Sequence, residues 1–268
     1  MQEILKGLGR VVLAYSGGVD STFLLKAAVD RLGAKNVLAC MSIGPSEPAY
    51  QVKRAVEFAE SISAELQTIE ADELDDPNFT VNKPDRCFHC KSHLYKSLTR
   101  IAEQRNFNSV ICGSNFDDKK DFRPGNRAAE LFGVRSPLAQ AQLTKDEIRQ
   151  LSRELNLPTA DVPASPCLAS RIQYGLEITR ERLNQVDQSE EFLRALGLVE
   201  FRIRHHDQIA RIEVHSQDIP KITAEPNRSK IVEKLKSVGF KFVTVDLQDF
   251  RTGSLNELLT ELQKQKSR

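Results

Sequence analysis

Three cysteines stand in settings that could support sulfur or metal chemistry. Cys87 and Cys90 share a C-x-x-C spacing in DRCFHCKSHLY, and Cys167 follows Pro166 directly in ASPCLAS, four residues before Arg171. A thiolate is both a nucleophile and a metal ligand, and nearby cations favour it. On its own, the C-x-x-C pair is compatible with a redox dithiol, half of a zinc site, part of an iron–sulfur site, or a structural role.

Neighbouring residues leave several of these alternatives open. His89 and His93 could complete a local zinc site, which needs about four ligands. Three thiolates could instead hold three irons of a [4Fe–4S] cluster and leave the fourth iron open to an extra sulfide. Cys167 could also be a semi-buried loop thiol. The two remaining cysteines lie inside apolar runs, so burial as small hydrophobic residues is expected for Cys40 and Cys112.

The segment AYSGGVDST (14–22) has the composition of an anion-binding turn at a helix start. Its glycines allow close approach of the backbone, and the first amides of a helix favour an anion. It is neither G-x-x-x-x-G-K-S/T nor G-x-G-x-x-G. An acidic residue in such a turn suggests Mg²⁺. A capped helix start with a tight turn is the simpler alternative. The residues expected to bind nucleotide are Ser16, Gly17, Gly18, Val19, Asp20 and Ser21.

The elements around this turn predict an α/β fold. Short apolar runs predict strands at 10–15, 36–43, 64–71 and 109–114, with a weaker fifth at 134–139. Amphipathic segments between them predict helices at 21–33, 47–63, 89–106 and 144–156. This alternation predicts a doubly wound parallel sheet, which binds ligands at the carboxyl ends of its strands.

The pattern changes after about residue 160. Helices are expected at 179–197, 228–239 and 254–265, and strands at 201–206, 209–215 and 240–247. The sequence therefore predicts two domains. Residues 1–160 would form the nucleotide-binding domain and 161–268 a smaller C-terminal α+β domain, joined by a proline-containing stretch.

Composition narrows the classes of function. The chain has 268 residues, is 40% hydrophobic and 28% charged, and carries a net charge of +1, which is typical of a soluble globular protein. This charge gives no global field for nucleic acid, and no apolar run is long enough to span a membrane. The N-terminus shows no secretory pattern, so the expected location is cytoplasmic. Five cysteines, an odd number, argue against a disulfide framework.

The motif S-G-G-V-D-S after the first strand resembles the PP-loop of the ATP pyrophosphatase superfamily, which has a HUP-like fold. Together with RCFHCK, SNFDDKKDFRPG, SPCLASRIQYG and FRIRHHDQIARIEV, it resembles the LarE family over about residues 5–255. The resemblance implies an ATP-dependent sulfurtransferase that releases AMP and pyrophosphate. Its substrate would be pyridinium-3,5-biscarboxylic acid mononucleotide, in synthesis of the nickel-pincer nucleotide, the cofactor of lactate racemase.

Two sulfur sources occur in that family. In one type, three cysteines hold a [4Fe–4S] cluster that carries the sulfur, and in the other a single cysteine gives up its own sulfur and becomes dehydroalanine. Because this chain has all three cysteines, the resemblance favours a cluster on Cys87, Cys90 and Cys167. Sacrifice of Cys167 is the alternative.

The same resemblance assigns further residues. Adenine is expected near Met41 and Gly113, at the ends of two strands. The substrate's phosphate and carboxylates call for cationic donors, for which we assign Arg171, Arg202 and Arg204 with help from Ser170. Arg202 and Arg204 would share one face of a strand, although a solvated basic face is the alternative. The acidic residues that could contact Mg²⁺ or another metal, or simply lie on the surface, are Asp20, Asp118, Glu190 and Glu213.

Partners and rival functions follow from these assignments. The expected partners are ATP, Mg²⁺, the small-molecule nucleotide, further copies of the chain and proteins of the nickel-pincer pathway, with no nucleic acid and no membrane. Segment 117–125 is expected to be a loop that orders with substrate. The alternatives are another PP-loop enzyme, such as a tRNA thiolase or an NAD synthetase-like amide ligase, and a non-enzymatic nucleotide-binding regulator.

Overall fold

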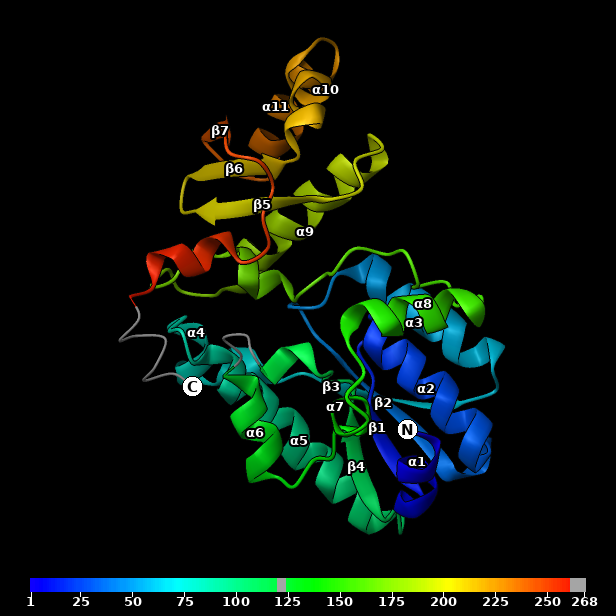
Figure 1. Ribbon diagram of the computed structural model, residues 1–268. Coiled ribbons are helices and arrows are strands. Elements are labelled where there is room, and N and C mark those ends of the chain that lie inside the picture. The colour runs from blue at the N-terminus through cyan, green and yellow to red at the C-terminus, as the bar shows by residue number, and fades with distance from the viewer. Residues whose placement is uncertain (120–123, 261–268) are drawn as a thin grey trace. The chain divides into compact units, whose positions relative to one another are not determined.

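A computed structural model describes residues 1–119 and 124–260 (Figure 1). The described chain forms two compact units. The first contains residues 1–73 and 85–165, and the second contains residues 74–84 and 166–260. The boundary predicted from the sequence lies at residue 160, with the insert, residues 74–84, in the first domain. In the structure, the insert belongs to the second unit and the boundary follows Ser165.

The first unit contains the predicted parallel sheet. Its four strands are β1 (Val11–Ala14), β2 (Val37–Ile43), β3 (Glu65–Glu70) and β4 (Ser109–Cys112). They follow the order β3-β2-β1-β4, and every pair is parallel. The order places β1 in the interior of the sheet, so the turn after β1 opens at the sheet's carboxyl edge, where ligands bind in this class of fold.

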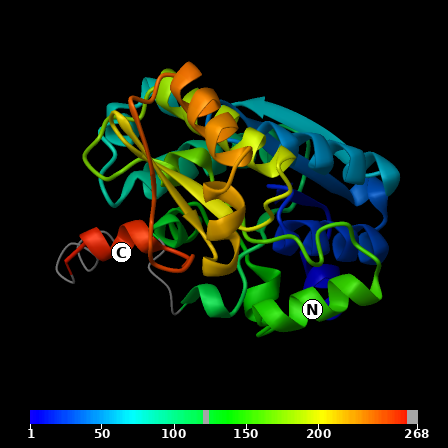
Figure 2. The ribbon, with the colours of Figure 1, turned by 90° about the horizontal axis from the view of Figure 1, so that it is seen from above.

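Helices cover both faces of this sheet (Figures 1 and 2). Val11 and Leu13 of β1 pack into one apolar core, with residues of the helices of one face, and Val12 packs into the other. Continuous apolar strands are expected where both faces are covered. The helices of this unit are α1 (Gln2–Leu8), α2 (Val19–Leu32), α3 (Ala49–Ser61), α5 (Arg86–Gln104), α6 (Gly125–Leu131), α7 (Pro137–Gln140) and α8 (Lys145–Glu154), with short 3₁₀ turns η1 (Ala34–Asn36) and η3 (Asp117–Lys119). The turn η2 (Glu73–Asp75) begins in this unit and continues into the insert.

The prediction of a fifth strand at 134–139 is wrong, because a single residue of this segment pairs with the sheet. Arg135 makes one parallel bridge to Ile111 of β4. Helix α7 then begins at Pro137, which occupies the start of the helix. Proline has no amide hydrogen to donate to a ladder and suits the first turn of a helix, so the segment cannot continue as an interior strand.

The second unit is the predicted smaller α+β domain. Strand β6 (Ile209–Val214) lies between antiparallel β5 (Phe201–His206) and parallel β7 (Phe242–Val245). The helices are α4 (Pro77–Thr80), α9 (Arg180–Ala195), α10 (Ile219–Thr223) and α11 (Asn227–Ser237), with 3₁₀ turns η4 (Leu168–Arg171), η5 (Ser216–Asp218) and η6 (Ser254–Leu258). The final helix predicted at 254–265 is a 3₁₀ turn over its first residues, and its end lies outside the described residues.

The insert 74–84 is fixed to the second unit by one buried asparagine. Asn82 is completely buried, and its φ is 58°. Its Nδ2 donates to the carbonyl oxygens of Ile172, Gln173 and Leu176 at 3.2, 2.8 and 2.9 Å. In return, the amide of Gly175 donates to the Asn82 carbonyl at 3.1 Å. These bonds join segments that are about 90 residues apart in the sequence.

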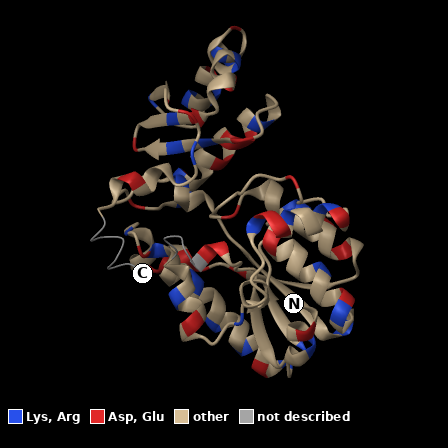
Figure 3. Cartoon of the chain, viewed as in Figure 1, with Lys and Arg blue, Asp and Glu red and all other residues tan. Residues whose placement is uncertain are grey.

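Charged side chains of both signs are interspersed over the helices of each unit (Figure 3). This distribution agrees with the formal net charge of +1. No helix in the part of the chain that the structure describes combines the length and the apolar character that a bilayer span requires.

Candidate active site

The turn after β1 presents backbone groups to the carboxyl edge of the first sheet. Gly17 has a φ of 69°, a conformation that favours glycine, and a Cβ added there would lie 2.6 Å from the Cβ of Ala55. Gly18 is the N-cap residue of α2, and no side chain of the described residues caps that helix. The first amides of α2 therefore point to the place where the sequence predicts an anion.

Hydroxyls and helix α3 hold this turn in shape. The Ser21 hydroxyl donates to the Gly18 carbonyl at 3.1 Å and lies 3.1 Å from the Ser16 hydroxyl. The side chain of Gln51, on α3, donates to the Ser16 carbonyl at 2.7 Å. Gly113 follows β4, and a Cβ added to it would lie 2.9 Å from the Ser21 amide nitrogen. The end of β4 can therefore approach α2 only because residue 113 has no side chain.

Asp20 lies in a polar cluster that includes a residue the sequence analysis missed. The Nζ of Lys145, at the start of α8, forms an ion pair with Asp20, and the Nδ2 of Asn115 donates to Asp20 at 3.2 Å. Lys145 is held in place because its own amide donates to Asp117 at 2.8 Å. This arrangement adds a cation to the predicted phosphate site. A separation of 125 residues gives the sequence no local signal for it.

Two other predicted residues of this unit lie in different settings. Met41 is 1% exposed and belongs to the apolar core, so its side chain packs rather than faces solvent. Asp118 is buried and accepts a hydrogen bond from the Asn115 amide at 3.1 Å. Residues 120–123 of the predicted substrate-ordered loop lie outside the described residues.

The C-x-x-C pair lies at the start of α5. Cys87 and Cys90 are three residues apart on this helix, so they lie on neighbouring positions of one face, and both are half-buried. His89 and His93 are each 3.7 Å from an aspartate oxygen, of Asp85 and of Asp72. Over residues 1–119 and 124–260, no three or more histidine, cysteine, aspartate or glutamate side chains form a group that could hold a metal ion.

The two remaining cysteines of the first unit are buried, as predicted. Cys40 is 1% exposed and Cys112 is 4% exposed. Burial raises the pKa of the Cys40 thiol to about 12, so this thiol stays protonated at neutral pH. Both cysteines pack in the apolar core between the sheet and α5.

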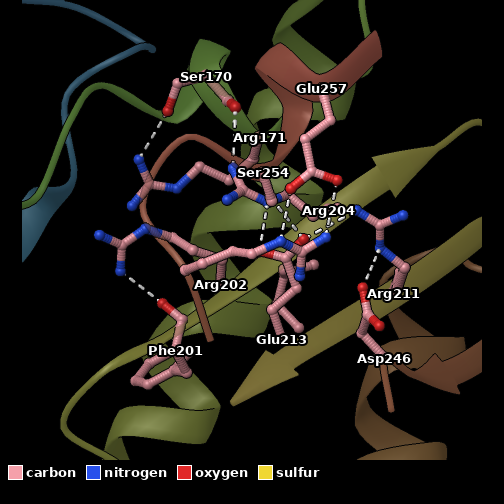
Figure 4. A network of polar contacts seen from close by, with 12 residues as sticks. Ser170, Arg171, Phe201, Arg202, Arg204, Arg211, Glu213, Asp246, Ser254 and Glu257 are labelled. Carbon is pink, nitrogen blue, oxygen red and sulfur yellow. Dashed lines mark hydrogen bonds and ion pairs between the residues drawn. The ribbon is translucent and has the colours of Figure 1, made fainter. Parts of the chain in front are cut away.

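In the second unit, one arginine organises the loop that carries Cys167. Cys167 is half-buried and is the N-cap residue of η4. Arg171 is 1% exposed, and its Nη1 donates to the carbonyls of Pro166 and Cys167. The same Nη1 donates to the Ser170 hydroxyl (Figure 4). The guanidinium therefore fixes the backbone on both sides of the peptide that leads into Cys167.

The charge of Arg171 is balanced by a buried carboxylate from α9. Its Nε and Nη2 donate to the two oxygens of Glu190 at 2.9 and 3.1 Å. The Ile203 amide of β5 donates to the same carboxylate at 3.2 Å. Burial alone would raise the pKa of Glu190, but the charge of Arg171 outweighs it, and the pKa lies below its ordinary value. Glu190 is therefore charged at neutral pH.

A second buried carboxylate joins β5 to β6. Glu213 accepts from Arg204 Nε at 2.8 Å, from Arg211 Nη2 at 2.8 Å and from the Ser254 hydroxyl at 2.8 Å (Figure 4). Arg204 also donates to the Ser170 carbonyl at 3.2 Å. Burial lowers the pKa of Arg204, while the contact with Glu213 opposes that shift.

Arg202 differs from its two neighbours in the network. It is 9% exposed, donates to the Phe201 carbonyl, and lies over the Phe250 ring with 5.2 Å between the guanidinium carbon and the ring centroid. The second unit thus brings together Cys167, Ser170, Arg171 and Arg204, and it engages Glu190 and Glu213 with arginines. This geometry favours a counter-ion role for both glutamates.

Comparisons with known proteins agree with this geometry. The family model described as NAD synthase matches residues 4–115, which include the glycine turn and all four strands of the first sheet. An uncharacterised protein of Synechocystis is 40% identical over 261 residues, 97% of each chain. An uncharacterised protein of Methanocaldococcus jannaschii is 32% identical over 91% of each chain.

A relative with a described activity covers both units. The pyridinium-3,5-bisthiocarboxylic acid mononucleotide synthase of Lactiplantibacillus plantarum is 37% identical over 259 residues, 97% of this chain and 93% of the relative. Identity of this extent shows that the chain belongs to the LarE family of PP-loop, ATP-using enzymes.

Proposed function

We propose that this chain uses ATP to convert the carboxylates of pyridinium-3,5-biscarboxylic acid mononucleotide into thiocarboxylates, as a step in making the nickel-pincer nucleotide. The observation that carries this proposal is the near full-length similarity to the Lactiplantibacillus plantarum synthase, at 37% identity. The uncapped glycine turn before α2 supports it, because such a turn offers amides to phosphate.

The first step activates a carboxylate, which is a poor electrophile. A carboxylate oxygen attacks the α-phosphorus of ATP, the bond between the α-phosphorus and the bridging oxygen breaks, and pyrophosphate leaves. The amides at the start of α2 and the hydroxyls of Ser16 and Ser21 would stabilise the developing charge. We assign the Mg²⁺ contact to Asp20, with Lys145 as its cationic neighbour.

In the second step, a sulfur nucleophile attacks the acyl carbon and AMP leaves. A [4Fe–4S] cluster, if bound by Cys87, Cys90 and Cys167, would supply this sulfur. Each of the three thiols is half-buried. In the alternative, the thiolate of Cys167 attacks and forms a thioester. A base then removes the Cα proton, the Cβ–S bond breaks, and the thiocarboxylate leaves dehydroalanine behind. Each carboxylate consumes one ATP.

The arginines of the second unit would have different roles in this reaction. Arg171 would position Cys167, because it bonds the carbonyls of Pro166 and Cys167. Arg204 would support Ser170 through the carbonyl of that residue. Arg202 and the Ser170 hydroxyl would bind the substrate's phosphate or carboxylates directly. These assignments keep the three arginines and Ser170 that the sequence singled out, but separate positioning from contact.

Mass spectrometry of protein and product tests the proposal. The wild-type chain would be incubated anaerobically with ATP, Mg²⁺ and the biscarboxylate mononucleotide, beside Cys167→Ala, Cys87→Ala and the buried control Cys40→Ala. Thiolated product with AMP supports sulfur transfer. A wild-type protein lighter by one H₂S identifies Cys167 as the source. Unchanged protein mass, with loss of activity in Cys87→Ala as well, identifies the cluster route.

An amide ligase is the second candidate, because the matching family model is that of NAD synthase. Such an enzyme would also adenylate a carboxylate, but ammonia rather than sulfur would attack it. AMP release that depends on ammonia and persists in Cys167→Ala would contradict sulfur transfer and support this candidate.

A further inference from the structure

Two glutamates meet at the carboxyl edge of the first sheet, away from the glycine turn. Glu47 lies in the turn between β2 and α3, and Glu73 begins η2 after β3. Strands β2 and β3 are parallel neighbours, with Ile43 opposite Glu70 at their ends. The two connections therefore leave the sheet side by side, and neither glutamate has a role in the chemistry proposed above.

Oxygen atoms in this place are buried without hydrogen-bond partners. Glu73 is 4% exposed and Ser46 is 2% exposed. Glu73 Oε1, Glu47 Oε2 and the Ser46 hydroxyl are all buried, and the described residues provide none of them with a partner. A buried polar atom without a partner costs about 1–3 kcal/mol, and more when it is charged, so these three atoms call for a ligand.

The two orphaned carboxylate oxygens converge on one point beside Gly44. A Cβ added to Gly44 would lie 3.4 Å from Glu73 Oε1 and 3.6 Å from Glu47 Oε2. It would also lie 2.5 Å from the Ala71 Cβ. Residue 44 therefore has no room for a side chain, and both orphaned oxygens lie close to its backbone.

Electrostatics makes the pair unfavourable without a counter-charge. Burial first, and then the negative charge of Glu73, raise the pKa of Glu47 to about 8, against backbone amides that lower it. Two carboxylates this close do not both ionise readily unless a cation or a proton lies between them. No arginine or lysine forms an ion pair with either one among the described residues, in contrast to Glu190 and Glu213 in the second unit.

We propose that Glu47 and Glu73 bind a divalent cation of the hard, oxygen-preferring class, Mg²⁺ or Mn²⁺, between their orphaned oxygens near Gly44, with the Ser46 hydroxyl as a further oxygen ligand. Mg²⁺ is commonly held by one or two carboxylates and completes its shell with water and phosphate oxygens, so two glutamates are enough. This site is separate from Asp20, which lies on α2 and pairs with Lys145. Because both open at the carboxyl edge of one parallel sheet, the cation would lie on the nucleotide side of the first unit.

Titration of the nucleotide-free chain with Mn²⁺, followed by electron paramagnetic resonance of the free ion, tests this site directly. The variants are Glu73→Gln and Glu47→Gln, and the control is Glu70→Gln, an exposed glutamate at the end of β3. Mutation of even the outer partners of a metal commonly costs about 10- to 100-fold in affinity, so loss of a direct ligand should weaken one Mn²⁺ site at least about 10-fold. Glu70→Gln should bind as the wild type does.

Equal Mn²⁺ binding by the wild type and both glutamine variants would overturn the proposal and identify the pair as sharing a proton instead. Thermal unfolding with and without Mg²⁺ gives an independent readout and shows whether each variant is folded. Mg²⁺ should raise the Tm of the wild type and of Glu70→Gln more than that of the two variants. Since neither measurement contains ATP or substrate, a negative result leaves the sulfur-transfer proposal untouched.

Discussion

The two units present groups that could bind an anion in opposite ways. In the first, the turn before α2 relies on backbone amides, two glycines and hydroxyls, with a single ion pair at Asp20. In the second, four arginines gather around two buried carboxylates, and Arg171 and Arg204 are each bonded to a glutamate (Figure 4). Partial charges of amides need no counter-ion inside the fold, whereas a buried guanidinium does.

This difference explains why a ligand-binding role is harder to predict from the sequence for arginines than for a glycine turn. A glycine turn exposes its donors only where the backbone permits, so its position in the sequence already indicates a ligand. A buried arginine needs a counter-ion within the protein. Once that ion pair has formed, its remaining N–H donors bond to whichever acceptors lie beside it. Arg171 shows this clearly, because its donors are divided between Glu190 and the loop of Cys167.

The largest effect is expected from removing the counter-ion of Arg171. Glu190→Ala removes the carboxylate that balances the buried Arg171 guanidinium, which should destabilise the second unit by about 3–5 kcal/mol. Urea unfolding followed by circular dichroism measures this change. Glu191→Ala, an exposed residue of the same helix, is the control and should change stability by less than about 0.5 kcal/mol.

The pH dependence of this loss follows from the lowered pKa of Glu190. A carboxyl whose folded pKa is depressed contributes stability above its unfolded pKa and loses it as the pH falls through its folded pKa. The gap between wild type and Glu190→Ala should therefore be full at pH 7 and should narrow in acid. A gap that is constant from pH 7 down to pH 2 would show that packing, rather than charge, determines the loss.

In the first unit, the cation that pairs with Asp20 at the proposed phosphate site should matter more for chemistry than for folding. Lys145→Gln removes the partner of Asp20, and loss of one electrostatic donor to a transition state typically costs about 100-fold in kcat. Release of pyrophosphate measures the effect. Lys26→Gln, in an exposed ion pair on α2, should leave the rate unchanged. Equal rates for wild type and Lys145→Gln would show that amides alone suffice.

Backbone shape at the turn should have a smaller effect. Gly17→Ala places a side chain at a φ of 69° and against Ala55, which costs about 1–2 kcal/mol of backbone strain and should weaken ATP binding about 10-fold. Calorimetric titration with a non-hydrolysable ATP analogue measures it. Gly7→Ala, where no atom lies within 4 Å of the added Cβ, is the matched control. Unchanged affinity in Gly17→Ala would argue against the anion-binding turn.

The smallest effect concerns an exposed ion pair at the end of β6. A hydrogen bond to Glu200, with a further one to Asp249, raises the pKa of His215. A group with a raised folded pKa stabilises the protein below its unfolded pKa and loses this contribution as the pH rises through its folded pKa. His215→Gln should therefore lower stability at pH 5 by less than about 1 kcal/mol and have no effect at pH 9. A larger loss at pH 9 would contradict this assignment.

Much of the fold could be predicted from the sequence, because the patterns that indicate strands and helices are local. The four parallel strands, their order of alternation with helices, and the smaller α+β domain were predicted correctly from apolar runs and helical periodicity. The prediction of a fifth strand was wrong because Pro137 begins helix α7. The domain boundary differed because the contacts of Asn82 with residues 172–176 lie far away in the sequence.

The candidate site was predicted less completely, for the same reason. Ser16, Gly17 and Asp20 lie close together in the sequence, so they form a motif that the sequence alone reveals. Lys145 and the pair Glu47–Glu73 become visible only when the sheet brings distant connections together. The arginines of the second unit were identified as a group, but their pairing with Glu190 and Glu213 is a property of burial, which the sequence does not display.

Asn82, which bonds residues 74–84 to the second unit, also limits how the two units can be expressed as separate polypeptides. A polypeptide beginning at Pro166 would contain three strands and most helices of that unit, yet Asn82 and α4 would be left on the other product. The carbonyls of Ile172, Gln173 and Leu176 would then need a substitute donor. On the ribosome, Asn82 must wait until about 90 further residues have been made before its partners exist, so the second unit can complete its fold only after residues 172–176 have emerged.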